Sequence, residues 1–357
     1  MKNKNYSKNK VLRSAISLTL LMIGSVSFSY ANAEKIKFKV SGQVNRAITY
    51  ADNGTDSDIL FVDGNNSGTR LRVTGQMKLS PSSSAGIIWE TQYQDNSSSA
   101  IDIGDSDNKS TISSRKRDLW FKGGWGKLSL GQGDGAANGT SEVDYSGTAY
   151  IADYSGNNLD DGISFTDSTG NKVIKNGNVF SNFDGLSRND RVRYDTPKLG
   201  SLGVAVSGGQ DKSEIGLRFS KNLGGGTKLG AALGYVREDK KDFNQLDLSA
   251  AFITAGGLNI MGHYGERDID GKSVKPTGSY VKLGQKLGRH ALSLSYHQVE
   301  DLAAVGDTAK RTNLAYVYNL RPSIEMYSSL QNSSLDRATG PALDDVKQFS
   351  VGSRFRF

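Results

Sequence analysis

From Ile36 to Phe357 the chain alternates apolar and polar residues with a period of two over most of its length. This alternation is typical of β-strands that have one apolar and one polar face. In the segment Thr69–Leu79, for example, one face would carry Leu71, Val73, Met77 and Leu79, and the other Arg70, Arg72, Thr74, Gln76 and Lys78. We find about sixteen such segments, each close to the ~10 residues that a tilted membrane-spanning strand requires.

The connections between these segments alternate in length. Short Gly-rich turns such as Asn222–Thr227 alternate with longer polar loops such as Ala51–Gly68 and Asp95–Ser114. Short turns at one end and long loops at the other are typical of outer-membrane barrels. The polar faces carry too many Arg and Lys side chains to fill a dry core, so we expect them to face inward and the apolar faces to contact lipid. The predicted fold class is all-β, a transmembrane antiparallel β-barrel of about sixteen strands with long external loops.

The N-terminal segment Met1–Ala33 has the organisation of a secretory signal peptide. A basic start precedes an apolar run, Ser14–Tyr30, and Ala31-Asn-Ala33 forms a small-residue cleavage site that argues against the alternative of an N-terminal membrane helix. Cleavage would remove five basic residues and no acidic residue, which lowers the formal net charge from +7 to +2. We therefore expect a signal peptide at residues 1–33 and a single barrel domain at Glu34–Phe357, exported to the outer membrane.

The composition excludes several other classes of protein. There is no Cys, so no disulfide framework is possible, and export without disulfides fits the periplasm or the outer membrane. No run after residue 33 approaches the ~18 apolar residues of a membrane helix. The low mature charge and the lack of a basic low-complexity run argue against a nucleic-acid partner.

The longest connection, Gly133–Ser187, is strongly acidic. It carries Asp134, Glu142, Asp144, Asp153, Asp160, Asp161, Asp167 and Asp184 against only Lys172 and Lys175. A segment this long with little periodicity is usually functional or disordered, and the strands around it are rich in basic residues. We expect it to fold into the barrel mouth as a constriction loop that faces those basic residues across a water-filled pore. Tyr145 and Tyr154, in the near-repeated DYSG motifs, could pack it against the wall.

Three places in the sequence are similar to a known family. They are the run RDLWFKGGWGKLSLGQ at Arg117–Gln132, the run RNDRVRYDTP at Arg188–Pro197, and the terminal Phe357 of an alternating aromatic strand. Over nearly all of Glu34–Phe357 the chain resembles the general porins of Gram-negative bacteria. It departs from the family pattern at Gln132, where Arg is frequent, and near Asp190, where Asn is frequent.

The resemblance implies a sixteen-stranded barrel in the Gram-negative outer membrane, usually a homotrimer, with its third external loop folded inward. The terminal Phe357 resembles the signal that the barrel-assembly machinery reads, so that machinery and the outer-membrane lipids are expected partners.

We predict that opposed charges on the wall and on the loop set what passes through the pore. The basic candidates lie on or beside strands two, four and six: Arg70, Arg72, Arg115, Arg117, Arg188 and Arg191. Three of these, Arg70, Arg115 and Arg188, match the family's motif positions. The acidic candidates lie on the loop: Glu142, Asp144 and Asp153. The predicted function is an outer-membrane porin for passive diffusion of small hydrophilic solutes and ions.

Other chemistry finds little support in the sequence. The three His residues, His263, His290 and His297, have no metal-binding spacing and no arrangement around a Ser nucleophile, so we expect no catalytic residue, metal or cofactor. The predicted interface girdles comprise Trp89, Trp120, Trp125, Tyr316, Tyr318 and Phe355. Three alternatives remain open: a porin specific for a sugar or an anion, an outer-membrane barrel enzyme such as a lipase, and an adhesin or structural barrel with a plugged lumen.

Overall fold

The computed structural model describes residues 35–106, 110–152 and 158–357. The predicted signal peptide, Met1–Ala33, lies outside the described residues. The strands are β1 (Lys37–Asp52), β2 (Ser57–Val62), β3 (Arg70–Ser80), β4 (Ser83–Asp95), β5 (Ser110–Gly123), β6 (Gly126–Asp134), β7 (Ser164–Thr166), β8 (Lys172–Lys175), β9 (Arg188–Asp195), β10 (Leu202–Gly208), β11 (Lys212–Gly224), β12 (Thr227–Glu238), β13 (Phe243–Ile253), β14 (Leu258–Ile269), β15 (Thr277–Leu287), β16 (His290–Glu300), β17 (Thr308–Arg321), β18 (Ile324–Asp336) and β19 (Val346–Arg356). A 3₁₀ turn spans Asn176–Asn178.

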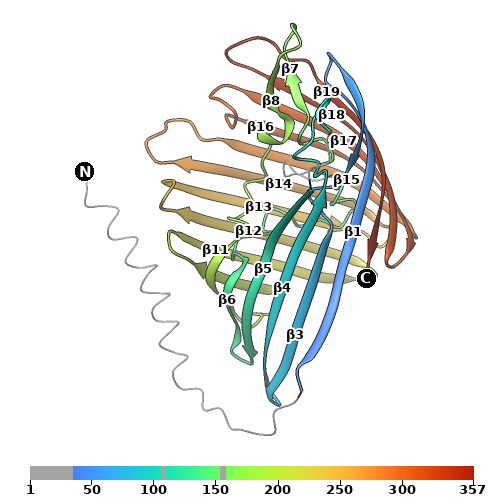
Figure 1. Cartoon of the computed structure of the whole chain (residues 1–357). Coiled ribbons are helices and arrows are strands. Elements are labelled where there is room, and N and C mark those ends of the chain that lie inside the picture. Colours follow the sequence, from blue (N-terminus) through green and yellow to red (C-terminus); the bar gives the residue numbers. More distant parts are fainter. Residues whose placement is uncertain (1–34, 107–109, 153–157) are drawn as a thin grey trace.

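Neighbouring strands pair antiparallel around a closed barrel (Figure 1). The barrel closes where β1 pairs with β19, from Gln43 opposite Arg356 to Asp52 opposite Lys347. On its other edge β1 pairs first with β3 and then with the short strand β2, so β2 and β3 share one position in the barrel. The barrel therefore has sixteen strand positions, and the expectation from the alternating segments is confirmed.

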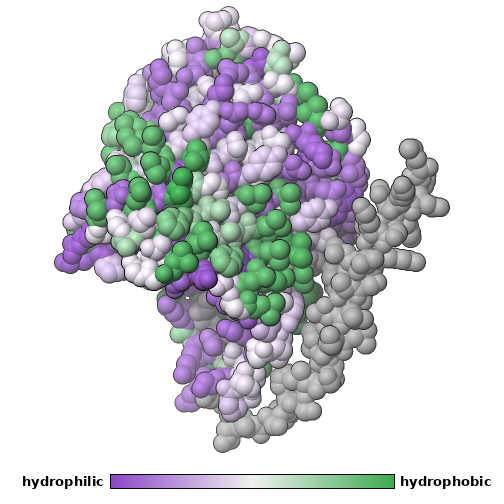
Figure 2. Space-filling view, turned by 180° about the vertical axis from the view of Figure 1, so that it is seen from behind, coloured by the Kyte–Doolittle hydropathy of each residue, from purple (hydrophilic) through white to green (hydrophobic). Residues whose placement is uncertain are grey.

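Most strand positions that face the lumen are polar or small and those that face outward are apolar; the exceptions are inward apolar residues such as Leu60 and Val62 of β2, which pack against a loop inside the barrel. On β16, Ala291, Ser293 and Ser295 are buried inside, whereas Leu292 and Leu294 are exposed on the outer surface. Hydrophobic side chains gather across the middle of the face seen in Figure 2, and hydrophilic ones predominate at its upper end. An exposed apolar surface of this extent belongs against lipid. None of the described residues forms a helix long and apolar enough to cross a membrane.

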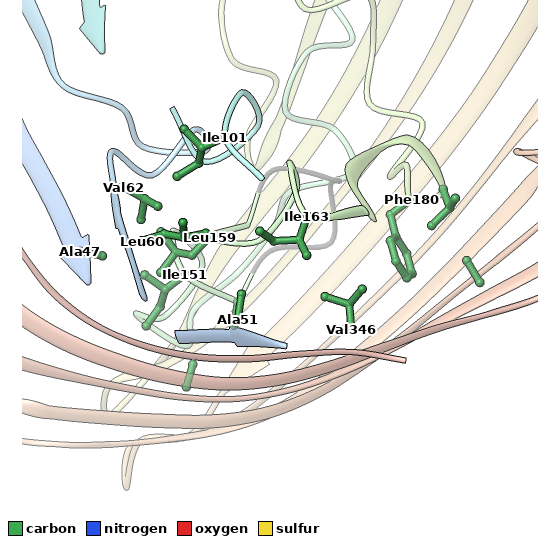
Figure 3. Close-up of a cluster of buried hydrophobic side chains, with 14 of the residues drawn as sticks. Ala47, Ala51, Leu60, Val62, Ile101, Ile151, Leu159, Ile163, Phe180 and Val346 are labelled. Atoms are coloured by element: carbon green, nitrogen blue, oxygen red, sulfur yellow. The ribbon is translucent and has the colours of Figure 1, made fainter. Parts of the chain in front are cut away.

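The largest apolar cluster lies inside the barrel and is built by a loop. This constriction loop, Gly135–Ser187 between β6 and β9, carries the small β7–β8 hairpin that the sequence did not indicate. In Figure 3, Ile151 and Leu159 of the loop lie beside Leu60 and Val62 of β2, above the inner face of the barrel strands. Because this cluster occupies the side of the lumen next to β1, β2 and β16–β19, the open path is displaced to the opposite side.

Candidate pore constriction

The first part of the constriction loop, residues 135–152, follows the inner wall of the barrel and is hydrogen-bonded to it at several points. The wall side chains that hold the loop backbone come from five different strands. Named with the donor first, these hydrogen bonds join Ala136 N to Ser207 Oγ (2.8 Å), Ala137 N to Glu214 Oε2 (2.8 Å), Ser249 Oγ to Thr140 O (2.6 Å), Tyr280 OH to Ala152 O (3.0 Å) and Asn313 Nδ2 to Ile151 O (3.3 Å). Repeated anchoring of this kind fixes the loop as part of the wall.

Glycines on the inner face allow the loop to approach the strands closely. A Cβ atom on Gly216 of β11 would lie 2.2 Å from the carbonyl oxygen of Ala136, and one on Gly234 of β12 would lie 2.2 Å from Thr140 Oγ1. On Gly230, a Cβ would lie 2.5 Å from the hydroxyl oxygen of Tyr145. Tyr145 packs against the wall as predicted, whereas Tyr154 lies outside the described residues. The absence of side chains at these positions creates the groove in which the loop lies.

One loop carboxylate is used to attach the loop to the wall. Asp144 forms an ion pair with Lys282 of β15 at 2.7 Å, and the two side chains are only 4% and 0% exposed. Burial acts to raise the pKa of Asp144, but the Lys282 ammonium and hydrogen bonds from Ser146 outweigh it and hold the pKa below its usual value. The expectation that Asp144 faces the pore is therefore wrong, because its side chain points to the wall.

Two further loop acids serve the same anchoring purpose. Asp160 accepts hydrogen bonds from Gln331 Nε2 (2.6 Å) and from Asn176 Nδ2 (2.7 Å), and Asp161 lies 3.8 Å from the guanidinium of Arg311. Burial raises the pKa of Asp160 above its usual value. These acids are thus removed from the pore, and the predicted pore residue Asp153 lies outside the described residues.

The opposite wall carries arginines gathered on one buried carboxylate. Glu90 of β4 is fully buried and accepts a hydrogen bond from Arg115 Nε at 2.6 Å. Arg72 of β3 forms a second ion pair with it, and Arg70 Nη1 lies 3.9 Å from Glu90 Oε1. Three guanidinium groups therefore share one carboxylate, which holds them together and leaves this wall positively charged.

Between the loop and this wall lies a cavity of about 530 Å³, which we call the eyelet. Every described residue that lines it is polar. Its basic members are Arg115, Lys116 and Arg188, and its acidic members are Asp134, Glu142 and Asp184. Opposed charges of equal number across an all-polar passage produce a transverse field that acts on water and ions.

The acidic side of the eyelet is partly compensated. Lys116 forms an ion pair with Asp134 at the end of β6. Asp184 accepts hydrogen bonds from Gly139 N (2.7 Å) and Ser141 Oγ (3.0 Å), yet burial raises its pKa above the usual value. Glu142 lies within reach of Asn182 Nδ2, at 3.4 Å.

Of the six predicted basic residues, Arg115 and Arg188 line the eyelet and Arg70 and Arg72 lie beside it on Glu90. The other two, Arg117 and Arg191, lie elsewhere. Strand β5 has a bulge: Lys116 pairs with Glu90 and Ser114 with Thr91, so Arg115 is an extra residue. Arg115 and Lys116 therefore both face the lumen, and Arg117 is turned to the outer surface, where its Nη2 donates to Gln132 Oε1 at 2.9 Å. A strict two-residue alternation could not reveal this shift.

Arg191 is the second correction. It is buried beneath the start of the loop, where its guanidinium binds Asp118 of β5 (2.8 and 3.0 Å) and the carbonyl oxygen of Gly131 (3.0 Å). This bidentate pair ties β5, β6 and β9 together, so the role of Arg191 is structural.

The prediction that Trp120 belongs to an outer girdle is also wrong, because Trp120 faces the lumen with its ring against Gly86.

The sequence reasoning missed Lys116, Asp134, Asp184 and Glu90. Asp134 and Asp184 stand at the two ends of the loop, where the chain enters and leaves the wall, and that position was the available signal.

Among the described residues there is no group of three or more His, Asp or Glu side chains that could hold a metal ion. His263 and His297 lie on the inner wall under the loop, and His290 stacks with Tyr316 at a ring distance of 6.0 Å.

Fold and site together define a membrane-spanning β-barrel with a charged internal constriction, an outer-membrane channel for passive diffusion of solutes. A family model described as Gram-negative porin matches residues 17–338. The chain therefore belongs to the Gram-negative porin family. None of the curated proteins compared with the sequence matches it.

Solved structures share the fold at low sequence identity. The anion-selective porin from Comamonas acidovorans is 18% identical with a TM-score of 0.65, over 90% of this chain and 100% of that one. The trimer form of OmpT, an outer membrane protein of Vibrio cholerae, is 14% identical with a TM-score of 0.58, over 91% and 100%. OmpF of Salmonella typhi in complex with daunomycin is 14% identical with a TM-score of 0.57, over 90% and 98%.

Proposed function

We propose that small hydrophilic solutes and ions cross the barrel through the eyelet and that its opposed charges select among them. The observation that carries this proposal is the all-polar cavity of about 530 Å³ with three basic and three acidic lining residues. Selection there needs only pore width and a fixed field, so no covalent step, cofactor or metal is required. The apolar cluster beneath the loop supports sieving, because it fills one side of the lumen and narrows the path.

A preference for anions is the second proposal, and the wall arginines favour it. Arg70 and Arg72 stand beside the eyelet and share the single carboxylate of Glu90 with Arg115. The lining of the eyelet has equal numbers of basic and acidic residues. Arg70 and Arg72 add two positive charges to this side of the path, and Glu90 adds only one negative charge, so the side has an excess of positive charge. The similar barrel from Comamonas acidovorans carries the description anion-selective, which supports the same direction for this chain.

We propose a homotrimer that covers polar groups on the outer wall. Arg117 and Gln132 bind each other on the outer surface of β5 and β6, and Arg46 donates to the Asp95 carbonyl oxygen at 2.6 Å on β1 and β4. With a rise of ~3.3 Å per residue and a tilt of about 45°, Arg117 lies roughly 14 Å above the turn at Gly123, within the membrane. A charge there is costly against lipid and is better covered by a second protomer.

We further propose that the segment Met1–Ala33 directs export and that Phe357 guides assembly. The backbone of Phe357 exchanges two hydrogen bonds with Gly42 of β1 (2.9 and 3.1 Å), so the last residue completes the seam between β19 and β1. An assembly factor that recognises this residue would act on the strand that closes the barrel. The outer-membrane lipids then cover the apolar outer face.

The proposal is tested by conductance of the refolded protein in planar bilayers under a salt gradient. A trimer of open channels gives conductance steps in threes. Glu142→Gln should shift the reversal potential toward anion selectivity, whereas Asp167→Asn, which removes the same charge from the exposed β7–β8 hairpin, should leave it unchanged. Absence of conductance refutes the channel, and equal shifts in both variants refute the assignment of selectivity to the eyelet.

A further inference from the structure

A second cavity opens in the lumen at the end of the barrel that carries the short turns. It measures about 760 Å³ and lies against the inner faces of β3–β6, and it shares no lining residue with the eyelet. Lys78, Lys122 and Lys127 line it, together with Trp120 and the serines of the β3–β4 turn. No acidic side chain is among the described residues that line it. We call it the turn-end cavity.

The strand register brings the lysines into one row across the wall. Lys78 of β3 pairs with Ser84 of β4, Ser84 with Lys122 of β5, and Lys122 with Lys127 of β6. Directly opposite residues of an antiparallel pair have Cβ atoms about 5 Å apart, and like charges at such positions are destabilising. The barrel therefore keeps two ammonium groups opposite each other at an energetic cost.

The two carboxylates that act on Lys127, Asp195 and Asp118, are each already paired with an arginine. Lys127 has Asp195 of β9 as its partner on the other side, but that carboxylate binds Arg193 at 2.7 Å. Within the part of the chain that the structure describes, neither Lys122 nor Lys127 takes part in a side-chain ion pair. Extra positive charge without a fixed counter-charge favours an anion from solution.

Trp120 gives the cavity a fixed floor. A Cβ on Gly86 would lie 2.4 Å from Cζ2 of the ring, so the indole rests on the bare backbone of β4. The ammonium of Lys127 lies 5.7 Å from the ring centroid of Trp120, which holds this lysine by a cation–π contact. An apolar floor reduces solvent screening on one side of the lysines and strengthens their attraction for an anion.

We propose that the turn-end cavity binds a small polyvalent anion whose phosphate or carboxylate oxygens bridge Lys78, Lys122 and Lys127. Short turns of such barrels lie on the periplasmic side, so the site would be filled from the periplasm. The inference rests on the proposed channel only for this direction of access, because binding itself requires no conduction. A polyvalent anion fits better than chloride, because the register holds several ammonium groups at fixed spacing.

The test is calorimetric titration of the folded, detergent-solubilised protein with inorganic tripolyphosphate at low ionic strength. Lys122→Gln and Lys127→Gln should each weaken binding about tenfold, the loss expected for one charge-assisted contact. The matched control is Lys228→Gln, which removes the same charge from the same end of the barrel on β12, outside the cavity, and should change affinity less than twofold.

Absence of tripolyphosphate binding to the wild-type protein would overturn the proposal. An equal loss of affinity in all three variants would also overturn it, because equal losses mean general attraction to a basic mouth of the barrel. Removal of one of two opposed ammonium groups should not lower the stability of the folded barrel. The thermal unfolding temperature of each variant, compared with that of the wild-type protein, checks this. Tripolyphosphate binding in a protein without conductance would refute the channel and leave the anion site standing.

Discussion

The ion pair between Asp144 and Lys282 should control whether the acidic side of the eyelet is rigid. Its side chains are almost fully buried, and its nitrogen–oxygen distance is 2.7 Å. Removal of one partner of such a pair leaves an uncompensated buried charge, which costs about 3–5 kcal/mol. A loss of about 3 kcal/mol lowers the equilibrium constant for docking of this part of the loop on the wall roughly 150-fold.

The rest of the loop stays anchored, so the effect should be local. Ala137 remains bound to Glu214, and Asp160 to Gln331, when Asp144 is released. Glu142 stands only two residues from the broken contact, so its carboxylate should fluctuate in the eyelet while the barrel remains folded. We expect Lys282→Met and Asp144→Leu to increase open-channel noise and mean conductance in single-channel recordings at pH 7.

The double variant Asp144→Leu with Lys282→Met separates the lost ion pair from a general defect. An apolar pair of similar volume is often as stable as a buried ion pair, so the double variant should return toward wild-type noise. The control Lys221→Met removes an exposed lysine from the turn end of β11 and should have no effect. A double variant as noisy as the single ones, or quiet single variants, would refute the reasoning.

The pH dependence follows from the pKa of Asp144, which is lowered from 3.8 in the folded protein. A carboxyl group with a lowered pKa stabilises the docked loop above pH 3.8, and this stabilisation is lost as pH falls through the folded value. The wild-type channel should therefore keep a quiet open state from neutral pH to about pH 4 and become noisy only below it. Onset of noise near pH 6 would exclude Asp144 as the titrating group.

Three further predictions follow from the packing. Gly216→Ala should displace the loop and reduce conductance, because the new Cβ meets the carbonyl oxygen of Ala136 at 2.2 Å, whereas Gly203→Ala, with 3.8 Å to its nearest atom, should conduct normally. Deletion of Phe357 should lower the yield of heat-modifiable barrel on gels, and an unchanged yield would count against an assembly role. Asp184→Asn should reduce the fall in Tm as pH rises above about 4, because burial raises the pKa of Asp184 above 3.8 and its ionisation then costs stability.

The barrel could be predicted from the sequence because the two-residue period is a local property of each strand. The segment Thr69–Leu79 was placed within one residue of β3, Arg70–Ser80, from its alternation alone. The short strand β2 was not predicted, since it exists through pairing with the upper part of β1. The bulge beside Glu90 also depends on a neighbouring strand, and it reversed the orientation expected for Arg117.

The candidate site was less predictable, because what distinguishes one loop acid from another is the residue that it contacts, and that residue is far away in the sequence. Glu142 and Asp144 stand two residues apart in the same loop and look alike in sequence. Lys282, 138 residues further along, makes one of them an anchor and leaves the other to line the eyelet. Charge placement along the sequence therefore located the constriction, but the contacts of each carboxylate decide which acids face the solute.

The inner faces of the strands nevertheless contain the reason for the position of the eyelet. Inward positions on β11, β12 and β14 are occupied by Gly216, Gly230, Gly234 and Gly265, against each of which a residue of the loop lies closely. Inward positions on β3–β5 carry Arg70, Arg72, Lys116 and the carboxylate of Glu90. A loop can pack only where the wall gives it room, and long charged side chains keep water beside them. The loop therefore packs against the part of the wall with inward glycines, and the passage stays open beside the part with inward charged residues. The transverse field of the eyelet thus follows from which residues occupy the inward-facing positions of the strands, which recur every second residue.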